Sequence, residues 1–151
     1  MGRVGGHEAR ITAAEFEALA TAGVPYVGQL GVRVEHLEAG LIRTRLPYSA
    51  LLLRPGGTIC GPALMGLADV TLYGAVLSLI GRVELAVTTD MSVHFLARPA
   101  PADVLAEGRI LKRGRRLAVG EVVMRSDGDP RAVCHVVGTY AIPPTPPTAR
   151  G

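Results

Sequence analysis

A single carboxylate, Asp69, stands in the middle of a long apolar segment. Between Arg54 and Arg82 it is the only charged residue. A buried, unpaired carboxylate is costly because the charge loses its hydration. Such a group can act as a general base toward water or as a nucleophile toward a carbonyl carbon. The alternative is a hydrogen bond within a core helix, without any role in a reaction.

The start of the same segment, Gly61-Pro62, has the composition of a helix N-terminus. Free backbone N–H groups and the positive end of the helix dipole can polarise a carbonyl oxygen. Gly61, a candidate N-cap, has no side chain and lets a substrate approach closely. Pro62, expected at the first helical position, lacks an N–H, so the Gly61 N–H becomes the more important donor.

The spacing of Gly61 and Asp69 restricts how they can act together. Eight helical residues rise about 12 Å and turn about 80° beyond two full turns. One carbonyl therefore cannot touch both residues of the same helix. If both act, they must come from two chains whose helices run antiparallel across an interface. We therefore expect an obligate homodimer, with pairing of dimers into a tetramer as a further step.

Other reactive residues give weaker signals. Cys60, just before the helix, is either a thiolate nucleophile at the positive helix end or a small buried hydrophobe. Arg54 is expected to bind a carboxylate or phosphate of a substrate, or to pair with Asp69. Cys134 and His135 are adjacent on a strand, so they point to opposite faces and cannot form a dyad. No metal site is expected, because no His, Cys or carboxylate cluster has ligand spacing.

The dense positive patch of the chain is a predicted turn that contains Lys112, Arg113, Arg115 and Arg116. This turn is either a solvated hairpin tip or a site for phosphate groups, with which Arg pairs well. A nucleic acid partner is not expected. The net charge is only +3, and the chain has no Trp, two Phe and four Tyr with which to stack bases.

The elements that must position these residues follow from periodicity and turn signals. Thr12 and Glu15 form a capping box for a short helix that ends at Gly23. Residues Gly61–Ile80 predict a long helix that is apolar on nearly every side. A helix of this length could span a bilayer, but its central Asp69 and the amphipathic strands around it favour a core helix and no membrane partner. The strand-like runs are Gly31–Leu37, Leu41–Pro47, Leu85–Leu96, Asp103–Lys112, Arg115–Arg125 and Arg131–Ile142.

The order of elements predicts an α+β protein in which a curved antiparallel six-stranded sheet wraps around one long central helix. With 151 residues, 48% of them apolar, one main domain is expected. We assign residues 1–24 to an N-terminal segment with a short helix, 25–142 to the main domain, and 143–151 to a disordered Pro-rich tail. Two cysteines and no signal sequence indicate a reducing, cytoplasmic location.

This architecture resembles the hotdog fold, and the residues narrow the resemblance. Over roughly residues 25–142 the chain is similar to phenylacetate-degradation-type (PaaI-like) acyl-CoA thioesterases. The segments that carry the resemblance are Arg54-Pro55-Gly56-Gly57-Thr58-Ile59-Cys60-Gly61-Pro62, Leu67-Ala68-Asp69, Thr88 to Leu96 with Arg98-Pro99, Lys112 to Ala118, and Gly138-Thr139-Tyr140.

The active-site segment departs from the family pattern, Asn-x5-His-Gly-Gly-x5-Ala-Asp, at three positions. Arg54 stands in place of the Asn, Cys60 in place of the His, and Pro62 in place of the second Gly. Gly61 and Asp69 are kept.

The resemblance implies hydrolysis of an acyl-CoA to the free acid and coenzyme A. Asp69 would be the general base or nucleophile, the Gly61 N–H would polarise the carbonyl, and Thr88 would lie near the nucleophilic water. No separate cofactor is implied, because coenzyme A is part of the substrate. A non-catalytic domain that binds acyl-CoA or another apolar ligand is the alternative. The expected substrate-binding residues are Arg54, Cys60, Pro62, Met65, Tyr73, Lys112, Arg113, Arg115 and Arg116, with Leu64 and Leu72 also along the acyl chain.

Overall fold

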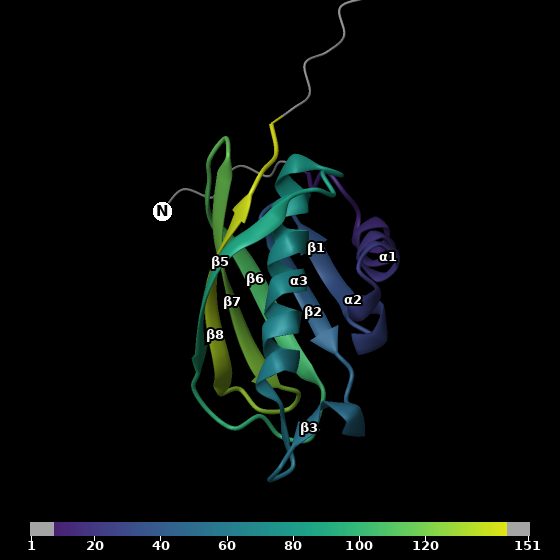
Figure 1. Ribbon diagram of the computed structural model, residues 1–151, viewed down its shortest axis with the longest axis vertical. Helices are drawn as coiled ribbons and strands as arrows, with labels where there is room; N and C mark the ends of the chain where they lie inside the picture. Colours follow the sequence, from purple (N-terminus) through teal and green to yellow (C-terminus); the bar gives the residue numbers. More distant parts are fainter. Residues whose placement is uncertain (1–7, 145–151) are drawn as a thin grey trace, which may run out of the picture.

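The computed structural model describes residues 8–144, in which one long helix lies against a six-stranded antiparallel sheet (Figure 1). The helix, α3, is Gly61–Ile80, as predicted. The strand order is β1-β2-β6-β7-β8-β5. This confirms the predicted α+β architecture. The strands are β1 Arg33–Glu38, β2 Leu41–Leu46, β5 Val87–Phe95, β6 Val104–Arg113, β7 Leu117–Ser126 and β8 Ala132–Ala141.

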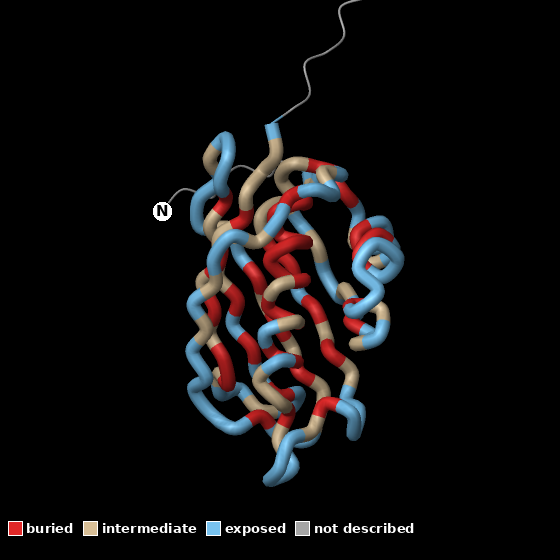
Figure 2. The backbone as a smooth tube through the Cα atoms, in the orientation of Figure 1, coloured by how far each residue is buried: buried red, intermediate tan, exposed pale blue. Residues whose placement is uncertain are grey.

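The close contact between α3 and the sheet depends on glycines in the sheet, which have no side chain. A Cβ atom at Gly138 of β8 would lie 2.5 Å from Leu72 Cδ1, and one at Gly120 of β7 would lie 2.8 Å from Leu72 Cδ2. Leu72 therefore fits between two glycines. By length and hydropathy α3 could cross a membrane, but 72% of its apolar window is buried inside this domain. It is packed as the core helix, as Figure 2 illustrates.

Two short helices lie on the other side of α3 (Figure 1). The first, α1 (Ala13–Gly23), begins as predicted, with the Glu15 N–H donating to Thr12 Oγ1 at 3.1 Å. The second, α2 (Pro25–Leu30), was not predicted, because its six residues show no helical periodicity of their own. Phe16 of α1 is fully buried in the core that α3 also forms, so the core is continuous across the predicted boundary at residues 24/25.

The segment before α3, to which no helix or strand was assigned from the sequence, contains a short 3-10 helix, η1 (Ala50–Leu52), and a small hairpin of β3 (Leu53–Arg54) and β4 (Thr58–Ile59). The N-cap of α3 is Cys60, whose backbone is extended (φ −71°, ψ 154°). Gly61 is therefore the first helical residue and Pro62 the second. Because Gly61 was predicted as the N-cap and Pro62 as the first helical residue, the helix begins one residue earlier than this cap prediction. The predicted disorder of residues 143–151 falls mainly outside the described residues.

A β-bulge in β5 determines which of its side chains face α3. The register pairs Thr88 with Tyr140 and Asp90 with Thr139 of β8, so Thr89 is an extra residue. A bulge shifts the alternation of side chains by one position. Thr88 and Met91 consequently both line the space beside α3. Regular alternation along a strand would place these two residues, three positions apart, on opposite faces, and the bulge brings them to the same face.

Candidate active site

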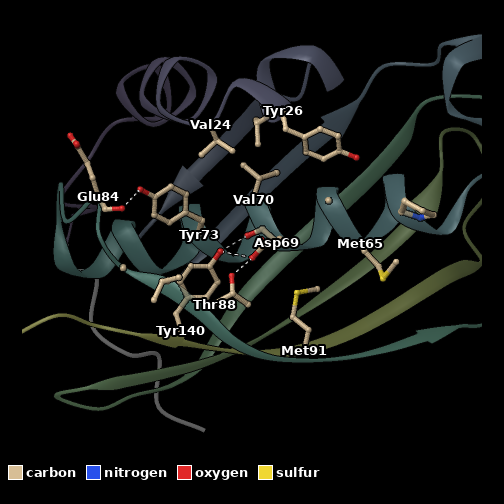
Figure 3. A pocket seen from close by; sticks show the side chains of 15 residues that line it. Val24, Tyr26, Met65, Asp69, Val70, Tyr73, Glu84, Thr88, Met91 and Tyr140 are labelled. Atoms are coloured by element: carbon tan, nitrogen blue, oxygen red, sulfur yellow. Dashed lines mark hydrogen bonds between the residues drawn. The ribbon is translucent and has the colours of Figure 1, made fainter.

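Asp69 lies beside a cavity of about 510 Å³ between α2, α3 and β5 (Figure 3). The cavity is mainly apolar, and its lining comes from four parts of the chain. The charged residues in the lining are Asp69 of α3 and Glu84, and Glu84 lies at one end of the cavity. The lining residues are Val24, Tyr26, Val27, Pro62, Met65, Gly66, Asp69, Val70, Tyr73, Glu84, Ala86, Val87, Thr88, Met91 and Tyr140.

Two hydroxyl groups donate to the same carboxylate oxygen of Asp69 (Figure 3). Thr88 Oγ1 lies 2.5 Å and Tyr140 Oη 2.6 Å from Asp69 Oδ1. The Tyr140 hydroxyl is also 2.9 Å from the backbone carbonyl oxygen of Asp69. No cation of the described residues forms an ion pair with Asp69. The carboxylate is thus held by neutral donors on one oxygen.

Tyr140 is held firmly beside Asp69. Its side chain is only 4% exposed, and its ring stacks on that of Tyr73 with centroids 6.0 Å apart and an interplanar angle of 10°. Burial, and then the negative charge of Asp69, raise the pKa of Tyr140 far above its usual value. The hydroxyl therefore remains a donor at physiological pH. Tyr73 in turn donates to the carbonyl oxygen of Glu84 at 2.9 Å.

The structure brings five of the sequence-predicted site residues to this cavity: Asp69, Thr88, Pro62, Met65 and Tyr73. Two predicted acyl-chain residues, Leu64 and Leu72, do not line it. Both are buried in the core, and Leu72 points at the glycines of the sheet rather than at the cavity. The all-round apolar character of α3 gave no indication of which face is packed and which lines the cavity.

Gly61, Cys60 and Arg54 lie at the N-terminal end of α3 and do not line this cavity. Eight residues of helix, about 12 Å, separate Gly61 from Asp69. The ring of Phe95 covers Gly61, where a Cβ atom would lie 3.5 Å from Phe95 Cζ. Arg54 is exposed on the β3–β4 hairpin and is not paired with Asp69, and Cys60 is half-buried.

The basic turn lies toward the opposite end of α3. Arg113, Arg115 and Arg116 line a second cavity of about 800 Å³, to which Arg10 and Arg82 also contribute. The lining also contains apolar side chains from the C-terminal end of α3, the following segment and the end of the described chain. Lys112, on the same turn, is exposed but does not line this cavity.

The remaining reactive side chains form no second centre within residues 8–144. Burial raises the pKa of the Cys134 thiol to about 11. The neighbouring His135 lies on the other face of β8, 3.1 Å from Glu121 Oε2, so Cys134 and His135 are separated as expected. In this described part of the chain, no group of three or more His, Cys, Asp or Glu side chains is arranged to hold a metal ion.

Sequence reasoning assigned no role to Tyr140 or to the residues of α2. Tyr140 was noted only as part of the Gly138-Thr139-Tyr140 motif, and nothing in the sequence indicates its pairing with Thr88. Val24, Tyr26 and Val27 were missed because α2 itself was not predicted.

Residues 56–133 match the family model of the thioesterase superfamily. The chain belongs to this superfamily. This thioesterase is therefore a thioester hydrolase, and its central helix and curved sheet are the hotdog fold of its structural relatives.

Known structures agree with this assignment over most of the chain. A Silicibacter sp. TM1040 protein, provisionally named a thioesterase, is 38% identical, with a TM-score of 0.83 over 93% of this chain and 97% of that one. A variant of the phenylacetic acid degradation protein PaaI from Thermus thermophilus is 28% identical, with a TM-score of 0.68 over 78% of this chain and 97% of that one. A Saccharolobus solfataricus protein, provisionally named an esterase, is 27% identical over 75% of this thioesterase and 79% of its own length.

Proposed function

We propose that this thioesterase hydrolyses acyl-CoA to a free acid and coenzyme A, with Asp69 as its general base or nucleophile. One observation carries the proposal. The Asp69 carboxylate is held at one oxygen by two hydroxyls and lines a mainly apolar cavity of about 510 Å³. A cavity of this size and character suits an acyl group next to a carbonyl that is to be attacked.

In the general-base route, Asp69 takes a proton from water while the water oxygen bonds to the thioester carbon. The carbon–sulfur bond then breaks, and the proton passes to the departing sulfur to give the free thiol. In the alternative route, an Asp69 oxygen bonds to the carbon directly, the thiolate leaves, and water opens the resulting anhydride. Both routes return Asp69 as a carboxylate.

The Gly61 N–H would polarise the carbonyl from a second copy of the chain. The 12 Å between Gly61 and Asp69 on one helix, about eight residues of rise, requires this arrangement. The edge of the sheet supports it, because β5 pairs only with β8 and is an edge strand. Exposed apolar side chains mark this edge: Val87 is 57%, Phe95 55% and Leu96 58% exposed. A homodimer that covers β5 would bury them.

The arginine-lined cavity supports recognition of the phosphate groups of coenzyme A. One segment, residues 82–87, separates the two cavities: Glu84, Ala86 and Val87 line the first, and Arg82, Val83 and Leu85 line the second. A ligand with an acyl thioester at one end and several phosphates at the other would bridge them along this segment.

The test is thiol release from short, medium, long and phenylacetyl CoA thioesters, measured for the wild type and Asp69→Asn. We expect Asp69→Asn to lose about 10²- to 10⁴-fold in kcat, because the variant cannot accept the proton. The matched control is Asp129→Asn, which makes the same change in the turn between β7 and β8, outside both cavities. It should retain wild-type turnover.

Equal turnover in the wild type and Asp69→Asn would place the base elsewhere and overturn the role of Asp69. Binding of the CoA thioesters without thiol release by the wild type would overturn acyl-CoA hydrolysis itself.

A further inference from the structure

The two hydroxyls that donate to Asp69 come from paired residues of neighbouring strands. Thr88 of β5 is the register partner of Tyr140 of β8, at the position where β5 has its bulge. Because the bulge turns Thr88 toward α3, both side chains reach the same oxygen, Oδ1, at 2.5 and 2.6 Å. Charge-assisted hydrogen bonds of this length are strong and directional.

The other carboxylate oxygen, Oδ2, is left open. No described residue donates a hydrogen bond to it. No buried side-chain nitrogen or oxygen of the described residues lacks a hydrogen-bond partner. Oδ2 has no partner, so it is not buried and is accessible from the cavity. The arrangement distinguishes the two oxygens: one is anchored, and the other is available to a water molecule or a substrate.

We propose that Tyr140 is a positioning residue that, together with Thr88, anchors Asp69 through Oδ1 and thereby directs Oδ2 at the reacting water or thioester carbon. The proposal rests on the proposed function, since it assumes that Asp69 reacts. In this role the Tyr140 hydroxyl acts through Asp69 and takes part in no bond that forms or breaks.

The surroundings of Tyr140 suit an anchor. Its ring is fixed by the stack on Tyr73, and Tyr73 is fixed by Phe16, edge-on at 5.6 Å, and by its hydrogen bond to Glu84. The raised pKa of Tyr140 keeps its hydroxyl protonated at physiological pH, so the hydroxyl remains a donor to Oδ1.

The charge balance of the cavity also suits a base. The other titratable groups that line it are Tyr26 of α2, Tyr73 of α3 and Glu84 before β5, and no Lys, Arg or His side chain among the described residues lines it. An ion pair would favour the charged carboxylate strongly and weaken its affinity for a proton. Neutral hydroxyls orient the carboxylate with a smaller effect of this kind.

The test is Tyr140→Phe, which removes one hydroxyl and keeps the ring and its stack. We expect kcat/KM to fall about 10- to 100-fold, the usual effect of losing one hydrogen bond to a charged group. We expect the loss to lie in kcat, with KM nearly unchanged, because the variant keeps the cavity but no longer directs Oδ2. The Tyr140→Phe and Thr88→Val effects should be non-additive in a double-mutant cycle, since both donors serve Oδ1. Thr88→Ser, which keeps the hydroxyl, should restore most of the loss seen in Thr88→Val.

Two controls separate this proposal from its premise. Tyr48→Phe changes an exposed tyrosine outside the cavity and should leave both kcat and KM unchanged. If Asp69→Asn is inactive while Tyr140→Phe keeps the wild-type kcat and KM, the positioning role is overturned and the proposed function stands. A lower kcat/KM in Tyr140→Phe that comes from a raised KM, with additive effects in the cycle, would also overturn it, as the mark of a merely structural residue. An active Asp69→Asn would instead overturn the proposed function.

Discussion

Gly61 contributes a backbone group rather than a side chain, and a proline substitution removes that group. It is the first residue of α3, and its N–H has no acceptor among residues 8–144. The preceding residue, Cys60, already has the extended backbone (φ −71°, ψ 154°) that a following proline requires. Proline is also well tolerated at the first position of a helix.

Gly61→Pro deletes the N–H. If this N–H polarises the thioester carbonyl, kcat should fall about 10²- to 10³-fold, as for other oxyanion donors. Gly61→Ala is the matched control, because it keeps the N–H and adds a methyl group near Phe95. Both variants place a Cβ atom directly before Pro62 in a helical conformation, so both should lower the melting temperature. Equal rates for Gly61→Pro and Gly61→Ala would show that the N–H does not contribute.

Sequence patterns located the single residues better than their surroundings. Asp69 was found because a lone charge in an apolar segment needs an explanation. Tyr140 was missed because its partner lies 71 residues earlier in the chain and only the strand register brings them together. Thr88 was found through family resemblance, whereas the bulge that places it on the same face as Met91 has no signal in the sequence.

Among the elements, α3 was predicted with its observed bounds because Gly-Pro and Gly mark its ends. The β5 bulge and the six-residue α2 were not predictable in this way, since neither has a periodicity of its own. The Arg45 cluster, which joins four strands or their ends, was also not evident. Arg45 of β2 bonds to Glu35 of β1, to Asp103 before β6 at 2.9 Å, and to Asp127 after β7 at 2.8 Å.

This cluster predicts loss of stability in acid. A hydrogen bond from the Tyr48 N–H, and then one from Arg45, lower the pKa of Asp103 below its usual 3.8. A carboxyl whose pKa is lower in the folded protein stabilises it above the unfolded pKa, and that contribution disappears as pH falls through the folded pKa. Asp103→Asn should reduce the free energy of unfolding at pH 7 by about 1 kcal/mol, and this difference should narrow below about pH 4.

Urea unfolding at pH 7 and pH 3 measures this difference. Asp129→Asn is the matched control. The pKa of Asp129 is also lowered, but by Arg131, only two residues away. A pair so local can persist in the unfolded chain, so its loss should change stability little at either pH. A constant difference between the wild type and Asp103→Asn across the pH range would contradict the prediction.

For the whole molecule, the distance between Gly61 and Asp69 predicts complementation between inactive chains. In a two-fold dimer, each site would take Gly61 from one chain and Asp69 from the other. Mixing Gly61→Pro with Asp69→Asn and refolding together should give dimers in which one of two sites is intact. Random pairing of equal amounts should restore about one quarter of wild-type thiol release.

Each variant refolded alone provides the control and should remain inactive, and the native mass should be twice 15.8 kDa. No recovery in mixtures that are shown to contain mixed dimers would mean that the two groups act within one chain or not at all. A native mass of one chain would contradict the dimer directly.

The strand order also determines the stage of synthesis at which the Asp69 site can form. β5 is made directly after α3, yet its neighbour in the sheet is β8, the last of the described strands to be synthesised. Until β8 has been made, Thr88 has no Tyr140 opposite it, and the Asp69 carboxylate lacks one of its two donors and part of its cavity. A growing polypeptide of this sequence therefore cannot form the Asp69 site before β8 has been synthesised, and premature termination before β8 yields a chain without that site.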